Sequence, residues 1–303
     1  MSNSKRFLSR AVTGVALCAA SGIMASCGAP PGSPQILGAD GVSIGTSSHV
    51  GGVAASAVQT NGILTVGASS TFFNKSGILL GPSGSLSQGA SETPSNLSTI
   101  TTVESSPAVL AAVDPSGAEA ATNPTLPSGC YLNNDPTTLD LNVASSGNCV
   151  LASGTYYVCK VSIASSGKIS VVSGGTATIY IDSPGRAGSQ CSGTNANQNG
   201  RFYVAASARF ANTTSGAGST AALTVYQVGT TPGTDQTRTC QTTSPVTCDF
   251  IVDDNATVIG GIDAPYSLVA LGNNAIFTGG ISAAYVNNWS NTQHGSSSGQ
   301  VIN

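Results

Sequence analysis

The sequence predicts an all-β protein built as a right-handed parallel β-helix (β-solenoid), with an antiparallel β-sandwich as the alternative. Three observations lead to this fold class. Charged residues make up only 8% of the chain and glycine occurs 37 times, a composition unlike that of helical bundles. Short apolar runs end at Gly or Asn, as strands commonly do. One block of sequence also repeats at a short offset, which is typical of stacked coils.

The first residues are typical of an export signal. Basic residues precede an apolar run over residues 11–23, which is too short to span a bilayer as a stable helix. The stretch from Met24 to Cys27 resembles a bacterial lipobox. We therefore expect residues 1–26 to be a lipoprotein signal peptide and Cys27 to carry the lipid anchor. Ordinary secretion without lipid is the alternative. Residues 27–35, rich in Gly, Pro and Ser, are expected to form a flexible tether.

The rest of the chain divides into four parts. Residues 36–87 hold apolar runs bounded by Gly and predict an N-terminal solenoid-like segment. Residues 88–127 are rich in proline and alternate little, so we expect a connector or cap with one short helix over 107–113. The strand pattern resumes over 128–292, the predicted C-terminal β-helix domain. Residues 293–303 are expected to form a disordered tail.

An internal repeat is the strongest sign of a solenoid. Residues 255–266 align without gaps on residues 274–285, at an offset of 19 residues and with seven identities in twelve. We expect the apolar residues of each copy to point inward, the Gly-Gly pair to form a corner, and the leading Asn to adopt a left-handed turn. Parallel coils advance about 4.8 Å each, so residues 128–292 would form roughly eight coils and about 40 Å of rod.

The cysteines predict disulfides. Cys18 would leave with the signal and Cys27 would carry lipid, which leaves six: Cys130, Cys149, Cys159, Cys191, Cys240 and Cys248. In an oxidising compartment these allow up to three disulfides, and the short spacing favours Cys240 with Cys248 while leaving the other pairings open. The chain has no CxxC motif and two histidines. We therefore expect no zinc site and no other cofactor.

Some β-helix proteins cleave carbohydrates, and such enzymes need clustered carboxylates. Asp249, Asp253 and Asp254 form the one dense acidic group, and Asp263 could lie one coil away. Neighbouring residues of a strand point to opposite faces, so Asp253 and Asp254 can share a target only in a turn. We favour a structural, turn-capping role for this group; a carbohydrate-active site and a calcium site are the alternatives.

Nucleophilic catalysis has weaker support. Two strings match G-x-S-x-G, residues 41–45 around Ser43 and residues 295–299, but neither lies between a clear strand and a helix. His49 and His294 are the two available histidine bases, and His294 is expected to be exposed in the frayed tail. The single Trp, Trp289, is expected to cap the core at the last coil, with stacking on a sugar as the alternative.

Several strings carry a resemblance to a known family: Ile262-Asp263-Ala264-Pro265, Gly272-Asn273-Asn274 and Gly279-Gly280. With the flanking strand patterns, they resemble the repetitive β-helical C-terminal region of PilX-like pilus-associated proteins, across residues 128–292. The resemblance implies a β-helical fold and an association with pili. This chain departs from the family by starting with a lipobox-like signal in place of a pilin-type membrane helix. The N-terminal runs resemble bactofilin-like short solenoids more loosely.

These observations predict a non-catalytic lipoprotein of the bacterial envelope, anchored in the outer membrane or at the cell surface, with a structural or adhesive role that could be pilus-associated. The expected partners are the membrane, through the lipid, and glycans or envelope proteins. Nucleic acid is not expected, because the formal charge of −3 becomes −6 once three basic residues leave with the signal. A carbohydrate-active enzyme and a glycan- or lattice-binding module are the alternatives; the latter would use exposed Thr, Ser and Asn ladders.

Overall fold

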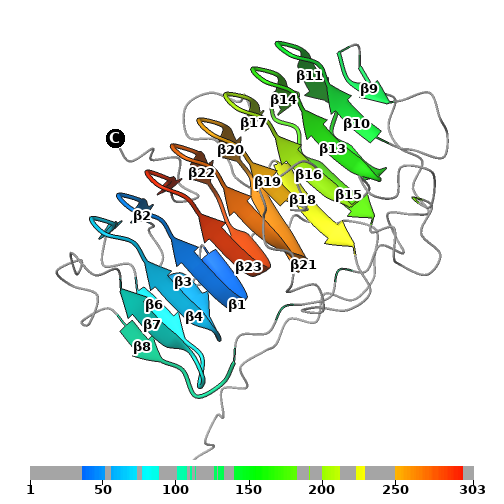
Figure 1. Cartoon of the computed structure of the whole chain (residues 1–303). Helices are drawn as coiled ribbons and strands as arrows, with labels where there is room; N and C mark the ends of the chain where they lie inside the picture. Colours follow the sequence, from blue (N-terminus) through cyan, green and yellow to red (C-terminus); the bar gives the residue numbers. More distant parts are fainter. Residues whose placement is uncertain are drawn as a thin grey trace, which may run out of the picture.

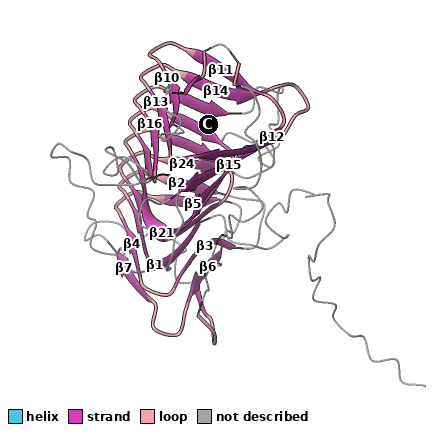
Figure 2. Cartoon of the chain, turned by 90° about the vertical axis from the view of Figure 1, so that its right-hand side faces the viewer, coloured by secondary structure: helices cyan, strands magenta, loops and turns pink. Residues whose placement is uncertain are grey.

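The computed structural model of the chain is a parallel β-solenoid. It describes residues 36–51, 56–73, 77–88, 101–107, 126–127, 129–132, 140–182, 200–211, 223–228 and 250–295, and positions 110, 113 and 191. Within these residues there are strands and loops but no helix (Figure 2). Every strand pairing is parallel except the short one between β9 (Tyr131–Leu132) and β10 (Asp140–Val143). The predicted solenoid is therefore confirmed, because a β-sandwich needs strands of alternating direction.

The strands form three lateral faces. Face 1 contains, in order along the rod, β10, β13 (Lys160–Ile163), β16 (Arg201–Val204), β19 (Phe250–Val252), β21 (Gly261–Leu271), β23 (Ile281–Asn288), β1 (Ile36–Ile44), β4 (Ile63–Val66) and β7 (Ser85–Gln88). Face 2 contains β11 (Asn148–Leu151), β14 (Lys168–Val171), β17 (Arg209–Ala211), β20 (Thr257–Ile259), β22 (Ile276–Thr278), β24 (Gln293–Gly295), β2 (His49–Gly51) and β5 (Thr71–Phe73).

Face 3 contains β12 (Gly154–Val158), β15 (Ala177–Asp182), β18 (Leu223–Val228), the first halves of β21, β23 and β1, and then β3 (Ser56–Thr60), β6 (Gly77–Leu80) and β8 (Thr101–Val103). The long strands β21, β23 and β1 bend and pair in both faces 1 and 3. A break in register marks the bend, for example between Gly38 and Gly41 of β1.

The coils do not follow one another in chain order along the rod. The C-terminal coils begin at the β10 end and proceed to β23 and β24 in the middle. There β23 pairs in parallel with β1, and β24 pairs with β2. The N-terminal coils then continue in the same direction to β8. In Figure 1 the blue strand β1 accordingly lies beside the red strand β23, halfway along the rod. The described strands within residues 36–88 and within residues 140–295 thus belong to the same two sheets.

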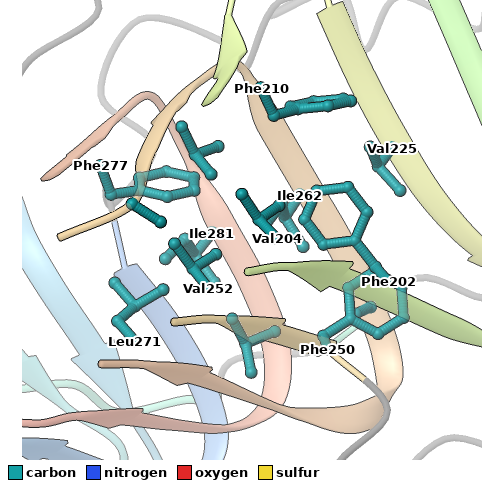
Figure 3. Close-up of a cluster of buried hydrophobic side chains, with 14 of the residues drawn as sticks. Phe202, Val204, Phe210, Val225, Phe250, Val252, Ile262, Leu271, Phe277 and Ile281 are labelled. Carbon is teal, nitrogen blue, oxygen red and sulfur yellow. The ribbon is translucent and has the colours of Figure 1, made fainter. Parts of the chain in front are cut away.

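The interior is a set of stacked apolar columns. Successive coils place side chains such as Phe202, Phe250 and Val269 above one another, all fully buried. The rings of Phe202 and Phe250 stack at 5.6 Å between centroids, and Phe210 meets Phe202 edge-on at 5.0 Å (Figure 3). Burying one such side chain contributes roughly 1.5–3 kcal/mol. Because a coil buries its apolar side chains against the next coil, stability arises from stacking.

The corner between faces 1 and 2 has the same backbone shape in eight coils. One residue per corner adopts a positive φ of 55° to 59°, and it is always Ser or Asn: Ser146, Ser166, Ser207, Asn255, Asn274, Asn291, Ser47 and Ser69. The next residue is small, and its N–H closes the turn in several coils, as when Ala256 donates to the Asp253 carbonyl. The left-handed residue itself donates to the neighbouring coil, as Asn255 does to the Asn273 carbonyl at 2.9 Å.

The repeat stacks as the sequence predicts. Thr257 to Ile259 pair directly with Ile276 to Thr278, at the offset of 19 residues, and both leading asparagines adopt the left-handed turn. The first glycine of the second copy, Gly279, has a φ of +141°, and a Cβ placed there would lie 1.8 Å from the Gly260 carbonyl oxygen. The two coils thus approach more closely than any side chain would allow.

Three expectations about the chain need correction. Residues 128–292 do not form eight coils of equal length. Face 1 contains six of their parallel strands, and residues paired on neighbouring coils can be as far apart in sequence as Phe202 and Phe250. Stacking constrains the strands alone, so the number of residues between successive strands can vary. Residues 293–295 belong to β24, not to a disordered tail. Of the helix expected over 107–113, three positions are described and none is helical.

The expected connector also contains a strand. Within residues 88–127, β8 pairs in parallel with β6 and extends face 3 by one strand. Glu104 then donates its backbone N–H to the Leu80 carbonyl at 2.7 Å. At the opposite end of the rod, β9 runs antiparallel to β10, and Cys130 beside it is joined to Cys149 of β11.

Candidate functional site

The acidic group lies in the corner that follows β19. Asp253 Oδ2 accepts a hydrogen bond from the Tyr203 hydroxyl at 3.0 Å, and Asp253 Oδ1 accepts one from the Asp254 N–H at 2.8 Å. Asp254 Oδ1 accepts one from the Asn273 N–H of the next coil at 2.6 Å. Burial, and then the Asp253 carboxylate, raise the pKa of Tyr203 to about 12. Both carboxylates are therefore engaged by turn and strand donors, and Asp249 lies outside the described residues.

Asp263 lies on a different face from this corner. It sits in the face 3 part of β21, in register with Tyr226 on one side and Ser282 on the other. Burial raises its pKa to about 6, although the Ser282 hydroxyl donates a hydrogen bond that opposes the rise. The fold thus places Asp263 apart from Asp253 and Asp254, and the three carboxylates do not form one exposed cluster.

The serine and histidine candidates are also separated. Ser43 lies within strand β1 on face 1, in register with Asn287 and Thr65, and not in a strand-to-helix elbow. His49 lies on face 2, with Nδ1 2.6 Å from the Thr71 hydroxyl. The second G-x-S-x-G string lies outside the described residues beyond Gly295.

His294 is where the sequence prediction was wrong. It is 2% exposed and its ring lies 5.8 Å from that of Phe277, in the interior column of face 2. Its strand pairs with β22 on one side and β2 on the other. The residue is interior because the C-terminal coil is covered by the N-terminal one, which no feature of the tail composition indicates.

Trp289 does not cap the end of the core, contrary to expectation. It occupies the first position of the corner between β23 and β24 and is partly exposed. Its carbonyl accepts a hydrogen bond from the Ser48 hydroxyl at 3.1 Å, across 241 positions of the chain. The last C-terminal coil lies in the middle of the rod, so its corner Trp faces a neighbour on each side.

Face 3 carries two outward columns of polar side chains. One is the tyrosine column, Tyr157, Tyr180 and Tyr226, and the other is the threonine column, Thr155, Thr178 and Thr224. The rings of Tyr180 and Tyr226 stack at 5.3 Å between centroids, 19° from parallel. Burial, and then a hydrogen bond to Asp182, raise the pKa of Tyr157. Tyr157 is 3% exposed, so within this column the half-buried Tyr180 and Tyr226 are the members whose ring edges and hydroxyl groups face the exterior.

The structure joins four of the six cysteines. Cys130 bonds to Cys149, and Cys159 bonds to Cys191. Cys240 and Cys248, the pair that the spacing favoured, lie outside the described residues, as does Cys27. The first disulfide joins the β9 region to β11, and the second holds Cys191 against the rod at the end of β12. The prediction that these cysteines form disulfides is thus confirmed for two pairs.

Across the described part of the chain, no three metal-ligating side chains gather in one place. The same residues include no helix of the length and apolarity that crossing a membrane requires.

Two structural features were missed from the sequence. The corner could have been found, since Ala-Ser-Ser-Gly occurs at residues 144–147 and again at 164–167, one coil length apart. The stacking of β1 on β23 had no comparable sequence signal. Comparison with family models, with curated proteins and with solved structures finds no match to this chain.

Proposed function

We propose that the chain is a non-catalytic lipoprotein of the bacterial envelope, tethered at Cys27, whose solenoid serves as a rigid structural or adhesive rod at the outer membrane or cell surface. A pilus-associated role is the form that the family resemblance favours. The observation that carries the proposal is a parallel solenoid held by two disulfides. Disulfides persist in oxidising compartments outside the cytoplasm, which agrees with the export signal read from the sequence.

The placement of the acidic residues supports a structural role over catalysis. Hydrolysis of a glycosidic bond needs two carboxyl groups roughly 5–10 Å apart that face the same sugar. Asp253 and Asp254 instead accept hydrogen bonds from Tyr203 and Asn273 within the solenoid. A carboxylate that holds two coils together is poorly placed to donate a proton to a substrate.

A glycan-binding module is the second candidate, and face 3 favours it. Tyr180, Tyr226 and the threonine column present hydroxyl groups on successive coils, which lie about 4.8 Å apart, whereas Tyr157 is buried. A polymer that lies along the rod could accept and donate hydrogen bonds at each coil. The hydroxyl groups of these side chains, and not the faces of the tyrosine rings, would then contact the polymer.

Anchoring is tested by Cys27→Ser in a host that processes lipoproteins. We expect the parent chain to incorporate an alkyne-tagged fatty acid and to fractionate with membranes, and the variant to do neither. Cys18→Ser is the matched control and should behave as the parent. Lipid incorporation that survives Cys27→Ser would refute the anchor.

The glycan alternative is tested on an array with the oxidised chain. Binding that is lost in Tyr180→Ala and kept in Asp253→Ala, without release of sugar, would favour the binding module. Sugar release that is lost in Asp253→Ala would instead contradict the non-catalytic proposal.

A further inference from the structure

The junction between the C-terminal and N-terminal coils differs from every other coil contact in the described structure. Here the neighbours are β23 and β24 from one end of the chain and β1 and β2 from the other. We call this junction the seam. Elsewhere, the described coils that stack on one another are consecutive in chain order. At the seam, hydrogen-bonded partners such as Ser48 and Thr292 are 244 positions apart.

The last C-terminal coil has an unusually polar interior at the seam. His294 lies in register between Phe277 and Val50, and Asn288 lies in register between Leu271 and Ile44. Both side chains are at least 98% buried.

Their polar atoms are poorly satisfied. Asn288 Oδ1 and Nδ2 and His294 Nε2 are buried without a hydrogen-bond partner among the described residues. The hydroxyl groups there are satisfied: Thr292 Oγ1 donates to Ser48 Oγ at 3.0 Å, and Ser48 Oγ donates to the Trp289 carbonyl at 3.1 Å. A buried polar atom without a partner costs stability, so the seam is weaker than the apolar coil contacts around Phe202 and Phe250.

No charged group faces His294 from the described elements packed against it. Its interior neighbours are Phe277 of β22 and Val50 of β2, with Val286 and Asn288 on β23 of its own coil. The titratable residues of the surrounding strands point outward from the core: His49 on β2, Asp40 on β1, Tyr285 on β23 and Asp263 on β21. A proton on His294 would therefore be a buried charge without a partner.

Burial lowers the pKa of His294 to about 4, from an ordinary value of 6.5. The folded seam thus binds this proton more weakly than an opened seam does. The contribution of neutral His294 to the free energy that holds the seam closed is fully present above pH 6.5. This contribution is lost as the pH falls toward 4. Acid therefore weakens the seam through His294, which is the one histidine in the described core.

We propose that the seam is an acid-sensitive joint: protonation of His294 separates the N-terminal coils from the C-terminal coils, while the disulfide-bonded coils at the β10 end stay folded. Opening leaves the edges of β23 and β24, and those of β1 and β2, without their partners. The rod thereby changes from one continuous solenoid into two linked blocks.

The test is an acid titration of the oxidised full chain from pH 7.5 to 3.5. Trp289, the single Trp and a seam residue, reports opening by fluorescence, and amide hydrogen exchange compares β23 and β1 with β13 and β14. We expect β23 and β1 to lose protection between pH 6 and 4, before β13 and β14 do. Simultaneous loss in all four strands, or no loss at pH 3.5, would overturn the proposal.

Variants identify the titrating group. His294→Phe, which continues the column from Phe277, should lower the midpoint of opening by about one pH unit or more. His294→Leu provides the same test if the larger ring does not fit. His49→Gln removes the other, outward histidine and should leave the midpoint unchanged. Asn288→Leu should protect the seam at neutral pH while its acid sensitivity remains. An unchanged midpoint in the His294 variants would refute the role of this residue.

Discussion

Replacing Gly279 by alanine should destabilise the solenoid strongly, whereas the same replacement at the adjacent Gly280 should not. A φ of +141° costs a residue with a Cβ roughly 1–3 kcal/mol. The new Cβ would also lie 1.8 Å from the Gly260 carbonyl oxygen, a backbone atom that cannot rotate away.

Relieving that contact moves two coils apart and weakens the hydrogen bonds from Gly260 N–H to the Thr278 carbonyl and from Ile262 N–H to the Gly280 carbonyl, both 2.9 Å long. Each is worth roughly 0.5–1.5 kcal/mol, so we expect a total loss of about 3–5 kcal/mol. A Cβ on Gly280 would meet no atom within 4 Å. Gly280→Ala should therefore change the free energy of unfolding by less than about 1 kcal/mol, and in the stabilising direction.

Urea denaturation of the oxidised chain measures this difference, followed by Trp289 fluorescence and far-ultraviolet circular dichroism. The two variants carry the same replacement at adjacent positions, so each is a control for the other. Equal denaturation midpoints for Gly279→Ala and Gly280→Ala would refute the reasoning that close backbone approach fixes the first glycine of the pair.

Three further predictions concern other parts of the rod. Asp263→Asn should raise the free energy of unfolding by about 3 kcal/mol at pH 8 and by almost nothing at pH 3.5, since the folded carboxyl has its pKa raised to about 6 and its ionisation is a cost; denaturation at both pH values checks this. Removing the Cys130 to Cys149 disulfide by a double alanine replacement should lower stability by about 3 kcal/mol, from the chain entropy of a loop of this length; melting of the oxidised parent and the variant would reveal it, and equal melting temperatures would contradict it. Asn274→Gly should be neutral while Asn274→Val should cost about 1–2 kcal/mol, because the corner needs a positive φ; similar losses in both variants would mean that the asparagine side chain, not the backbone, is what matters.

The repeated coil could be predicted from sequence because its requirements are local. Parallel stacking places equivalent residues above one another, so the Gly-Gly pair and the leading Asn recur at the coil length. The same logic could have paired Cys130 with Cys149, which are 19 positions apart. It could not have paired Cys159 with Cys191, since their separation of 32 positions matches none of the coil offsets.

The seam could not be predicted, because nothing local specifies which coil covers a terminal one. Any alternating strand of the right length can stack on β23, and the choice of β1 depends on the path of the whole chain. His294 was misplaced for a related reason. It lies 17 positions after its neighbour Phe277, not 19, so the repeat alignment does not extend to it. The glycines and serines that follow it suggested a chain end, whereas the strand itself is internal.

The stacking of the first coil on the last is tested most directly by bridging two introduced thiols. Ser43 and Asn287 are in register on the outer side of face 1, so Ser43→Cys with Asn287→Cys should be joined rapidly within one chain by a short reagent such as dibromobimane. Ser43→Cys with Ser162→Cys is the control, because five strand spacings, about 24 Å, separate these positions on the same face. Efficient bridging of the first pair and none of the second is the predicted result. No bridging of the first pair, or bridging only between two chains, would show that the ends of the chain do not meet in one solenoid.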